Sequence, residues 1–510
     1  MKNGEAEKRI RCPGLSGRLM SADEAAGLIE DGMTVAASGF TPAGCPKAVP
    51  HALAEQVSSG QRRARIPLLS GASTGEEIDS ELSAAGVIER RAPYMTSSAL
   101  RGAVNRGETA YQDVHLGEMA QNARYGQYGK IDVAVVEACA ITEDGGIVPT
   151  TAVGCAQTYV RLADKVIVEL NLAQPGELEG IHDIYTPADP PCRGPIPLLS
   201  AGDRIGGTAI PCPPEKIAAV VVTDAPDKPR ALAKPDENSR KIAANIVKFL
   251  QGERAAGRLT AGTVPLQSGV GSVANAVLEG LGDSDFTHLS FYSEVMQDAV
   301  LALMDSGKAD FCSATSMSMS PDAMAKLLGG LEAYKGKIIL RDSEVSNSPE
   351  VIRRLGVIAM NTAVEADIYG NVNSSHMFGT KVYNGIGGSG DYARSASVSI
   401  FMTVSTAKDG KISSIVPAVT HVDHTEHDVD VIVTEQGLAD LRGKSPKERA
   451  ELIIENCAHP DYRPLLREYF EKACRECGSS QTPVLLDECF GFHRRFKDKG
   501  SMLPGPGGED

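Results

Sequence analysis

Short apolar runs alternate with longer amphipathic segments along most of the chain. The runs are rich in valine, isoleucine and alanine and indicate strands covered on both faces, whereas the longer segments repeat apolar positions at helical spacing. This alternation is typical of an α/β fold with mainly parallel sheets. The predicted strands span residues 33–39, 132–138, 165–171, 218–223, 263–269, 337–341 and 430–435, and the predicted helices span 22–30, 237–250 and 272–281.

The chain is too long for one hydrophobic core, because it has 510 residues. A proline- and charge-rich stretch at 223–237 interrupts the pattern and is predicted to be a linker. It would join an N-terminal α/β domain, 1–222, to a C-terminal α/β domain, 238–500. The remaining residues, 501–510, are predicted to form a flexible tail.

Similar landmarks recur on the two sides of this linker. Ser38 lies near the end of a predicted strand and precedes Glu137 by 99 residues, and Ser268 precedes Glu365 by 97 residues in the same way. The matching order and spacing predict two related open α/β halves.

Composition excludes several classes of protein. The net charge of −15 argues against nonspecific binding to nucleic acid or to an anionic membrane. The polar N-terminus lacks the apolar core of a signal peptide, and the apolar run at 217–222 is too short to span a bilayer. The 11 cysteines are scattered and odd in number, which argues against a disulfide framework. We therefore expect a cytoplasmic protein.

One apolar run leads directly to an acid. Residues 290–299 read S-F-Y-S-E-V-M-Q-D-A, with Ser293 and Glu294 where a predicted strand gives way to a helix. If Ser293 were the N-cap, Glu294 would lie in the first turn, where the helix dipole favours a carboxylate. Alternatively, Glu294 projects from the carboxyl end of a strand, where open α/β sheets place their chemistry. The pattern alone leaves both interpretations open.

Two glycine-rich stretches are candidates for anion binding. The first, S-G-V-G-S-V-A-N-A-V at 268–277, follows a predicted strand and opens a helix, and the second, N-G-I-G-G-S-G-D, spans 384–391. Free backbone N–H groups in such loops can hold an anion. A dinucleotide fingerprint is the alternative for the first loop, although no acid ends the next strand at the usual distance. Neither loop has the lysine of a phosphate-binding P-loop.

Other polar residues offer weaker signals. His421, His424 and His427 recur three apart and would suit a metal on one helix face, but their flanks look like strands, which would scatter the ligands. Cys474 and Cys477 form a single C-x-x-C without a second pair at zinc spacing, so no metal site is predicted. The chain contains no G-x-S-x-G of a serine hydrolase.

Several longer motifs resemble one family. They are S-E-V-M-Q-D around Glu294, L-Q-S-G-V-G-S-V-A-N-A-V-L-E-G-L, E-A-D-I-Y-G-N-V-N-S, N-G-I-G-G-S-G-D-Y-A-R-S-A and V-T-E-Q-G-L-A-D-L-R-G. Together they resemble the acetyl-CoA hydrolase/transferase family of class I coenzyme A transferases, and the resemblance runs from near residue 38 to near residue 465. It implies two open α/β domains with the active site between them, usually in a homodimer.

The resemblance also implies roles for individual residues. Glu294 is the expected nucleophile, which forms a mixed anhydride with the acyl group and then a thioester with CoA. The backbone amides of Val270 and Gly388 are expected to stabilise the oxyanion, and Asn347 and Glu435 to support the site. The expected CoA contacts are Leu266, Gln267, Ser268, Gly269, Val270, Val364, Asn384, Gly388 and Lys408.

Glutamate chemistry agrees with this role. At an ordinary pKa of about 4.3 a glutamate is ionised at neutral pH and needs no partner base. CoA would be a substrate, and no resident cofactor or metal is expected. The likeness is strongest to bacterial members that use succinyl-CoA and acetate, with propionyl-CoA:succinate transfer and acetyl-CoA hydrolysis as alternatives. A nicotinamide-dependent oxidoreductase is the alternative from another class. The residue that grips the substrate carboxylate stays open among Lys228, Arg230 and Arg394.

Overall fold

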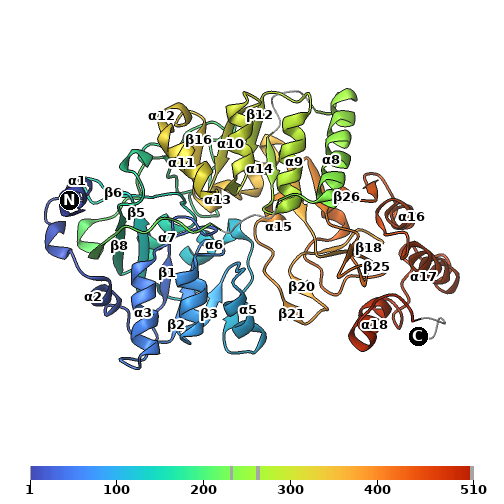
Figure 1. Cartoon of the computed structure of the whole chain (residues 1–510), viewed down its shortest axis with the longest axis horizontal. Coiled ribbons are helices and arrows are strands. Elements are labelled where there is room, and N and C mark those ends of the chain that lie inside the picture. Colours follow the sequence, from blue (N-terminus) through green and yellow to red (C-terminus); the bar gives the residue numbers. More distant parts are fainter. Residues whose placement is uncertain (1, 230–233, 260–264, 506–510) are drawn as a thin grey trace. The chain divides into compact units, whose positions relative to one another are not determined.

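A computed structural model describes residues 2–229, 234–259 and 265–505 (Figure 1). The chain forms two compact units from segments that are not contiguous in sequence. Unit 1 contains Met1–Ala231, Ser290–Leu355 and Asn384–Asp391, and unit 2 contains Leu232–Leu289, Gly356–Tyr383 and Tyr392–Asp510. The predicted boundaries at 222 and 238 stay a prediction, and residues 230–233 of the predicted linker lie outside the described part of the chain.

A seven-stranded sheet forms the first part of unit 1, with the order β10-β8-β5-β1-β2-β3-β4. Its neighbouring strands all pair in parallel. The chain builds the sheet outward from β1 in one direction and then from β5 in the other. The strands are β1 (Val35–Ala37), β2 (Ile66–Leu69), β3 (Ile88–Ala92), β4 (Ala110–Tyr111), β5 (Val133–Ala138), β8 (Lys165–Asn171) and β10 (Ile217–Thr223).

Helices accompany this sheet as the α/β pattern predicts. Helices α2 and α3 contact β10, and α7 contacts β1 and β5. Helix α2 ends before the predicted residue 30; a capping box of Ser21 and Glu24 starts it. The elements are α1 (Lys2–Arg9), α2 (Ala22–Ala26), α3 (Ala48–Ser58), α4 (Leu82–Ala84), α5 (Ser98–Asn105), α6 (Leu116–Arg124) and α7 (Ala156–Leu162), with the hairpin β6 (Ala140–Ile141) and β7 (Ile147–Val148).

A second group of strands in unit 1 carries the later segments of the chain. Strands β12, β14, β16 and β9 are consecutive neighbours, and β13 and β15 form a small parallel pair beside them. The strands are β9 (His182–Asp183), β12 (Leu289–Tyr292), β13 (Val295–Met296), β14 (Ala309–Ala314), β15 (Ser316–Met317) and β16 (Ile338–Arg341). The helices are α10 (Asp298–Asp305), α11 (Pro321–Gly329), α12 (Leu331–Tyr334), α13 (Ser343–Ser346) and α14 (Pro349–Leu355).

Unit 2 is built on strands in the order β27-β26-β22-β17-β11, of which only β27 is antiparallel to its neighbour. Helices α8 and α9 lie side by side, and both contact strands of this group. The strands are β11 (Leu266–Ser268), β17 (Ile358–Thr362), β22 (Val398–Met402), β26 (Val431–Thr434) and β27 (Gly437–Asp440). The helices are α8 (Glu237–Ala255), α9 (Ser272–Asp283), α15 (Ser389–Ser395), α16 (Pro446–Cys457), α17 (Arg463–Glu476) and α18 (Gly491–Lys499).

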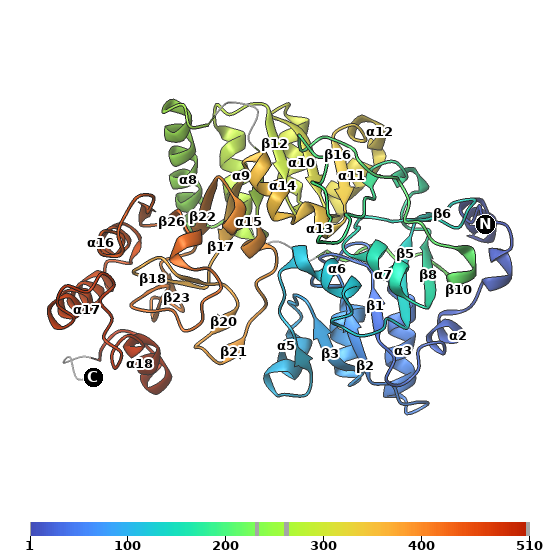
Figure 2. The ribbon, with the colours of Figure 1, turned by 180° about the vertical axis from the view of Figure 1, so that it is seen from behind.

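The C-terminal helices complete the core of unit 2, and Figure 2 shows them from behind. Ile453 of α16, Leu466 of α17 and Phe492 of α18 are buried in one hydrophobic cluster, and Met502 joins it beyond the last helix. Short strands lie beside this core: β18 (Glu365–Asp367), β19 (Val372–Asn373), β20 (His376–Met377), β21 (Lys381–Val382), β23 (Thr406–Ala407), β24 (Ile412–Ser413) and β25 (Ile415–Val416).

The predicted mixed α/β class with mainly parallel sheets is confirmed. Each predicted strand and helix has its counterpart, and β8 matches the predicted range 165–171 completely. In the described residues no helix combines the length and the apolar character that crossing a membrane requires.

Candidate functional site

Glu294 lies two residues beyond Tyr292, the last residue of β12, in the bend that leads to β13. Its backbone carbonyl accepts hydrogen bonds from the N–H groups of Thr315 (2.9 Å) and Ser316 (3.1 Å), which follow β14. The next helix, α10, begins later, with Gln297 as its N-cap. The interpretation of Ser293 as a helix N-cap is therefore wrong, and Glu294 projects from the end of a strand.

Asn347 holds the Glu294 carboxylate. It is the C-cap of α13, which follows β16, and it is fully buried. Its Nδ2 donates to Glu294 Oε1 at 2.9 Å and to Asp391 Oδ2 at 3.3 Å. One amide group thus bridges two carboxyl groups, and the carboxylate of Glu294 has a defined orientation.

The backbone of Gly388 packs closely against the Glu294 carboxylate. A Cβ atom at this position would lie 2.0 Å from Glu294 Oε1 and 2.2 Å from Asn347 Nδ2, closer than any side chain tolerates. Asn384, at the start of the same loop, accepts a hydrogen bond from the Tyr111 hydroxyl through its backbone carbonyl at 3.3 Å. Glycine is required at 388 because the backbone must approach the acid closely.

The ionisation of Glu294 differs from the sequence-based expectation. Burial raises the pKa of Glu294 to about 7, and the hydrogen bond from Asn347 opposes that rise. Burial also raises the pKa of Asp391, and the nearby charge of Glu294 adds to the effect. Glu294 is therefore only partly ionised at neutral pH, unlike an ordinary exposed glutamate, and a raised value of this kind is typical of functional sites.

The other predicted site residues belong to unit 2. They lie within β11 or after strands β11, β17, β22 and β26; because these four strands run in parallel, the residues directly after them share the carboxyl edge of that strand group. They are Leu266, Gln267, Ser268, Gly269, Val270, Val364, Lys408 and Glu435. This edge is where α/β sheets bind ligands, which suits the predicted CoA contacts.

Some of these side chains are already engaged within unit 2. The Gln267 amide donates to Asn361 Oδ1 at 3.1 Å and its oxygen accepts from the Met360 N–H at 3.0 Å. Glu435 accepts hydrogen bonds from the Ser405 N–H (2.8 Å) and from the Ser405 hydroxyl.

Lys408 and Val270 are available at the surface. Val270 is 44% exposed in the turn before α9. Lys408 is exposed at the tip of the β23–β24 hairpin, where its φ of +50° marks a tight turn, and its Nζ lies 5.1 Å from the centre of the Phe496 ring.

The candidate carboxylate-gripping residues remain unassigned. Lys228 pairs with Glu77 in unit 1 at 2.8 Å, and Arg394 lies exposed on α15. Arg230 lies outside the described residues.

The histidine cluster is divided among different surroundings. His421 contacts His376 with the ring centres 3.8 Å apart and the rings tilted by 30°, His424 is buried against Phe401, and His427 lies in a short 3-10 turn. Within the described ranges no group of three or more histidine, cysteine or acidic side chains is placed to hold a metal ion.

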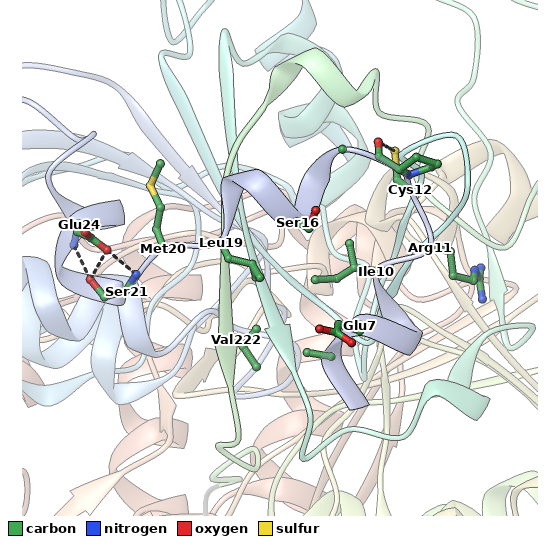
Figure 3. Close-up of a pocket in the computed structure, with 13 residues that line it drawn as sticks. Glu7, Ile10, Arg11, Cys12, Ser16, Leu19, Met20, Ser21, Glu24 and Val222 are labelled. Carbon is green, nitrogen blue, oxygen red and sulfur yellow. Dashed lines mark hydrogen bonds between the residues drawn. The ribbon is translucent and has the colours of Figure 1, made fainter. Parts of the chain in front are cut away.

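A pocket of about 610 Å³ lies elsewhere in unit 1 (Figure 3). The N-terminal segment and Val222 of β10 line it. Two of its charged side chains are already paired: Arg11 with Glu179, and Glu24 with Ser21 in a helix capping box. None of the predicted site residues lines this pocket, so we assign it no part in the chemistry.

Sequence reasoning missed two polar features of unit 1. Asp391 closes the second glycine loop, and the only signal in the sequence was an acid directly after the four glycines of that loop. Lys47 donates to Glu137 Oε2 (2.5 Å) and to Asp227 Oδ1 (3.0 Å), next to the ends of β1 and β5. Glu137 had appeared only as a landmark of the internal repeat.

Family models match most of the chain. Residues 7–222 match the acetyl-CoA hydrolase/transferase N-terminal domain, and residues 325–470 match the acetyl-CoA hydrolase/transferase C-terminal domain. Solved structures similar in fold include RipA from Yersinia pestis (TM-score 0.70, 22% identity, covering 90% of this chain and 98% of that one). A 4-hydroxybutyrate CoA-transferase from Porphyromonas gingivalis is also similar (TM-score 0.61, 21% identity, 90% and 98% covered).

Relatives in sequence span nearly the full chain. A succinyl-CoA:acetate CoA-transferase from Clostridium kluyveri is 53% identical over 97% of this chain and 92% of its own length. A propanoyl-CoA:succinate CoA transferase from Escherichia coli is 46% identical (95% and 98% covered), and an acetyl-CoA hydrolase from Saccharomyces cerevisiae is 42% identical (97% and 97%). With both family domains matched and identity this high over almost its whole length, the chain belongs to the acetyl-CoA hydrolase/transferase family.

Proposed function

We propose that this protein transfers CoA from succinyl-CoA to acetate, with Glu294 as the nucleophile. One observation carries the proposal: the Glu294 carboxylate ends a strand, accepts a hydrogen bond from Asn347 and lies against the backbone of Gly388. The similarity to the C. kluyveri succinyl-CoA:acetate CoA-transferase supports this pair of acids.

The reaction proceeds in balanced steps. Ionised Glu294 attacks the thioester carbonyl, the C–S bond breaks, and CoA leaves as a thiolate from a glutamyl–acyl anhydride. The thiolate then attacks the glutamyl carbonyl, which releases the first carboxylate and leaves a glutamyl-CoA thioester. The second acid repeats these two steps in reverse. Each step exchanges one anion for another, so the cycle consumes no proton.

Each addition creates an oxyanion that needs donors. The backbone amides of Gly388 and Val270 are our candidates, since losing one such donor typically costs about 10²–10³ in rate. Lys408 would meet a CoA phosphate as a point charge. CoA acts as a substrate in this scheme, without a resident cofactor, and the active assembly would be a homodimer.

Two variants of this function are close to the proposal. The E. coli propanoyl-CoA:succinate CoA transferase and the yeast acetyl-CoA hydrolase are only slightly less similar to this chain. Hydrolysis would follow if water reached the glutamyl thioester instead of a carboxylate. Rates with acetate, succinate and propionate as acceptors, measured beside the rate without acceptor, separate these three activities.

Covalent trapping tests the proposal. The protein is incubated with succinyl-CoA, reduced with borohydride and digested, and the modified peptide is mapped by mass. We expect modification at Glu294 alone, and neither modification nor transfer in Glu294→Gln, which keeps the shape of the side chain. Modification of another residue, or full turnover in Glu294→Gln, would refute the assignment. Turnover that requires a nicotinamide would favour an oxidoreductase instead.

A further inference from the structure

Asp391 is a second buried acid beside the predicted nucleophile, and the proposed mechanism does not use it. Its carboxyl group is linked to Glu294 by the single amide of Asn347. It also accepts a hydrogen bond from the Gly117 N–H, in the first turn of α6, at 2.9 Å. A Cβ at Gly117 would lie 2.6 Å from the Asn347 carbonyl oxygen, so the first turn of α6 packs directly on this pair.

The geometry assigns a place for a proton on Asp391. Both hydrogen bonds end on Oδ2. The other oxygen, Oδ1, lies 3.9 Å from His115 Nδ1. That nitrogen is buried and has no hydrogen-bond partner among the described residues. At 3.9 Å the two atoms are too far apart for a hydrogen bond, so a proton on Oδ1 would leave both hydrogen bonds to Oδ2 intact.

Charge favours the same arrangement. The titratable groups that face Asp391 are Glu294, His115 and, from the exposed side of α6, Glu118. Two carboxylates joined by one amide in a buried site do not both ionise readily, because like charges repel strongly where water is excluded. An extra negative charge here would also oppose the oxyanion that forms on the acyl group.

We propose that Asp391 is a positioning residue that keeps its proton while Glu294 ionises, and that it anchors Asn347 for the reaction at Glu294. This inference rests on the proposed function, since it assigns Glu294 as the nucleophile. Asp391 touches neither CoA nor the acyl group in this scheme and acts through Asn347.

Asp391→Asn is the decisive variant. An asparagine reproduces the protonated acid, with its oxygen in place of Oδ2 and its NH₂ group directed at His115. The first measurement is the pH dependence of Glu294 modification by a water-soluble carbodiimide in the free protein, mapped by peptide mass. It reads the ionisation of Glu294 without relying on any transfer activity.

If Asp391 is already neutral, Asp391→Asn leaves the midpoint of Glu294 ionisation within about half a pH unit of wild type. If Asp391 is an anion, removing its charge lowers that midpoint by about one pH unit or more, and the proposal is overturned. Glu118→Gln is the matched control, because it removes a negative charge from the first turn of α6, next to the Gly117 whose N–H donates to Asp391.

The second measurement separates kcat from KM for CoA transfer. Asp391→Ala removes an anchor of Asn347, so kcat should fall about tenfold or more with little change in KM, while Asp391→Asn keeps most of the rate. Wild-type kcat in a folded Asp391→Ala protein would show that Asp391 positions nothing. If Asp391→Ala does not fold, the carbodiimide titration of Asp391→Asn still decides. If the wild-type protein shows no CoA-transfer activity, the proposed function is refuted, whereas the carbodiimide titration still tests the protonation of Asp391.

Discussion

The residue at position 388 must lack a Cβ atom, and glycine is the residue that meets this requirement. The Glu294 carboxylate occupies the volume that a Cβ would take, which is why no other residue fits here. In the proposed mechanism, the same close approach would also bring the backbone of the glycine loop to the acyl oxyanion. The steric fit against Glu294 and the proposed stabilisation of the oxyanion therefore both require glycine at position 388.

Substitution of Gly388 by alanine tests this fit. The added methyl group must displace Glu294 or the loop, and a misplacement of about 1 Å can cost about 10²-fold in rate. We expect kcat/KM for CoA transfer in Gly388→Ala to fall by about 10²-fold or more, with an unchanged circular dichroism spectrum. Gly329→Ala serves as control, because no atom outside its own helix turn lies within 4 Å of the position that an added Cβ would take. Equal activity of the two variants would contradict the close approach.

At the scale of elements, buried charges connect the loops at one edge of the seven-stranded sheet. Lys47 precedes α3, Glu137 is the penultimate residue of β5, and Asp227 follows β10; all three side chains are at most 10% exposed. Glu137 also accepts hydrogen bonds from Thr150 Oγ1 and Asn171 Nδ2. One ammonium group thus satisfies acids from two other segments and fixes where those segments meet.

Lys47→Met removes the cation and leaves both acids buried without it. Breaking a buried ion pair from one side costs about 3–5 kcal/mol. We expect a clear fall in the free energy of unfolding, measured by urea denaturation at pH 8, where ionised acids most need the lysine. Lys130→Met is the matched control, since Lys130 pairs with Asp132 and Asp164 at the surface and such pairs contribute about 1 kcal/mol or less. Similar losses in the two variants would contradict a special role for Lys47.

At the scale of the whole molecule, several buried acids shape the response to pH. Burial raises the pKa of Glu294 and Glu137 to about 7 and that of Asp342 to about 8, and it also raises the pKa of Asp391. In the unfolded chain these groups titrate near 4, so between pH 5 and 8 the folded protein binds more protons than the unfolded one. Stability contributed by these groups is present below that range and is lost as pH rises.

The thermal unfolding midpoint should therefore fall between pH 6.5 and pH 9 at constant ionic strength. Glu294→Gln should reduce the fall, because it removes one buried acid whose ionisation costs stability. Differential scanning calorimetry of both proteins across this range measures the effect. A midpoint that stays level or rises would show that these acids are ionised in the folded protein without cost.

The sequence was sufficient to predict those features that depend on residues close to one another along the chain. The alternation of apolar runs and amphipathic segments depends on contacts a few residues apart, so it predicted β8 and β5 almost to the residue. The motif around Glu294 and the glycine loop at 384–391 were likewise visible as local patterns. Residues within a few positions of one another decide strand, helix and turn, which is why these predictions held.

Only the tertiary structure decided which distant residues contact these local motifs. Asn347 lies 53 positions from Glu294 and 44 from Asp391, and no local pattern shows that one amide bridges both acids. The raised pKa of Glu294 follows from burial, which depends on how distant segments pack around it. The sequence by itself determined which elements form. The packing decided that Glu294 follows a strand and does not sit in a capped helix turn, and it decided the ionisation of that acid, because solvation and Coulomb interactions depend on distances in space.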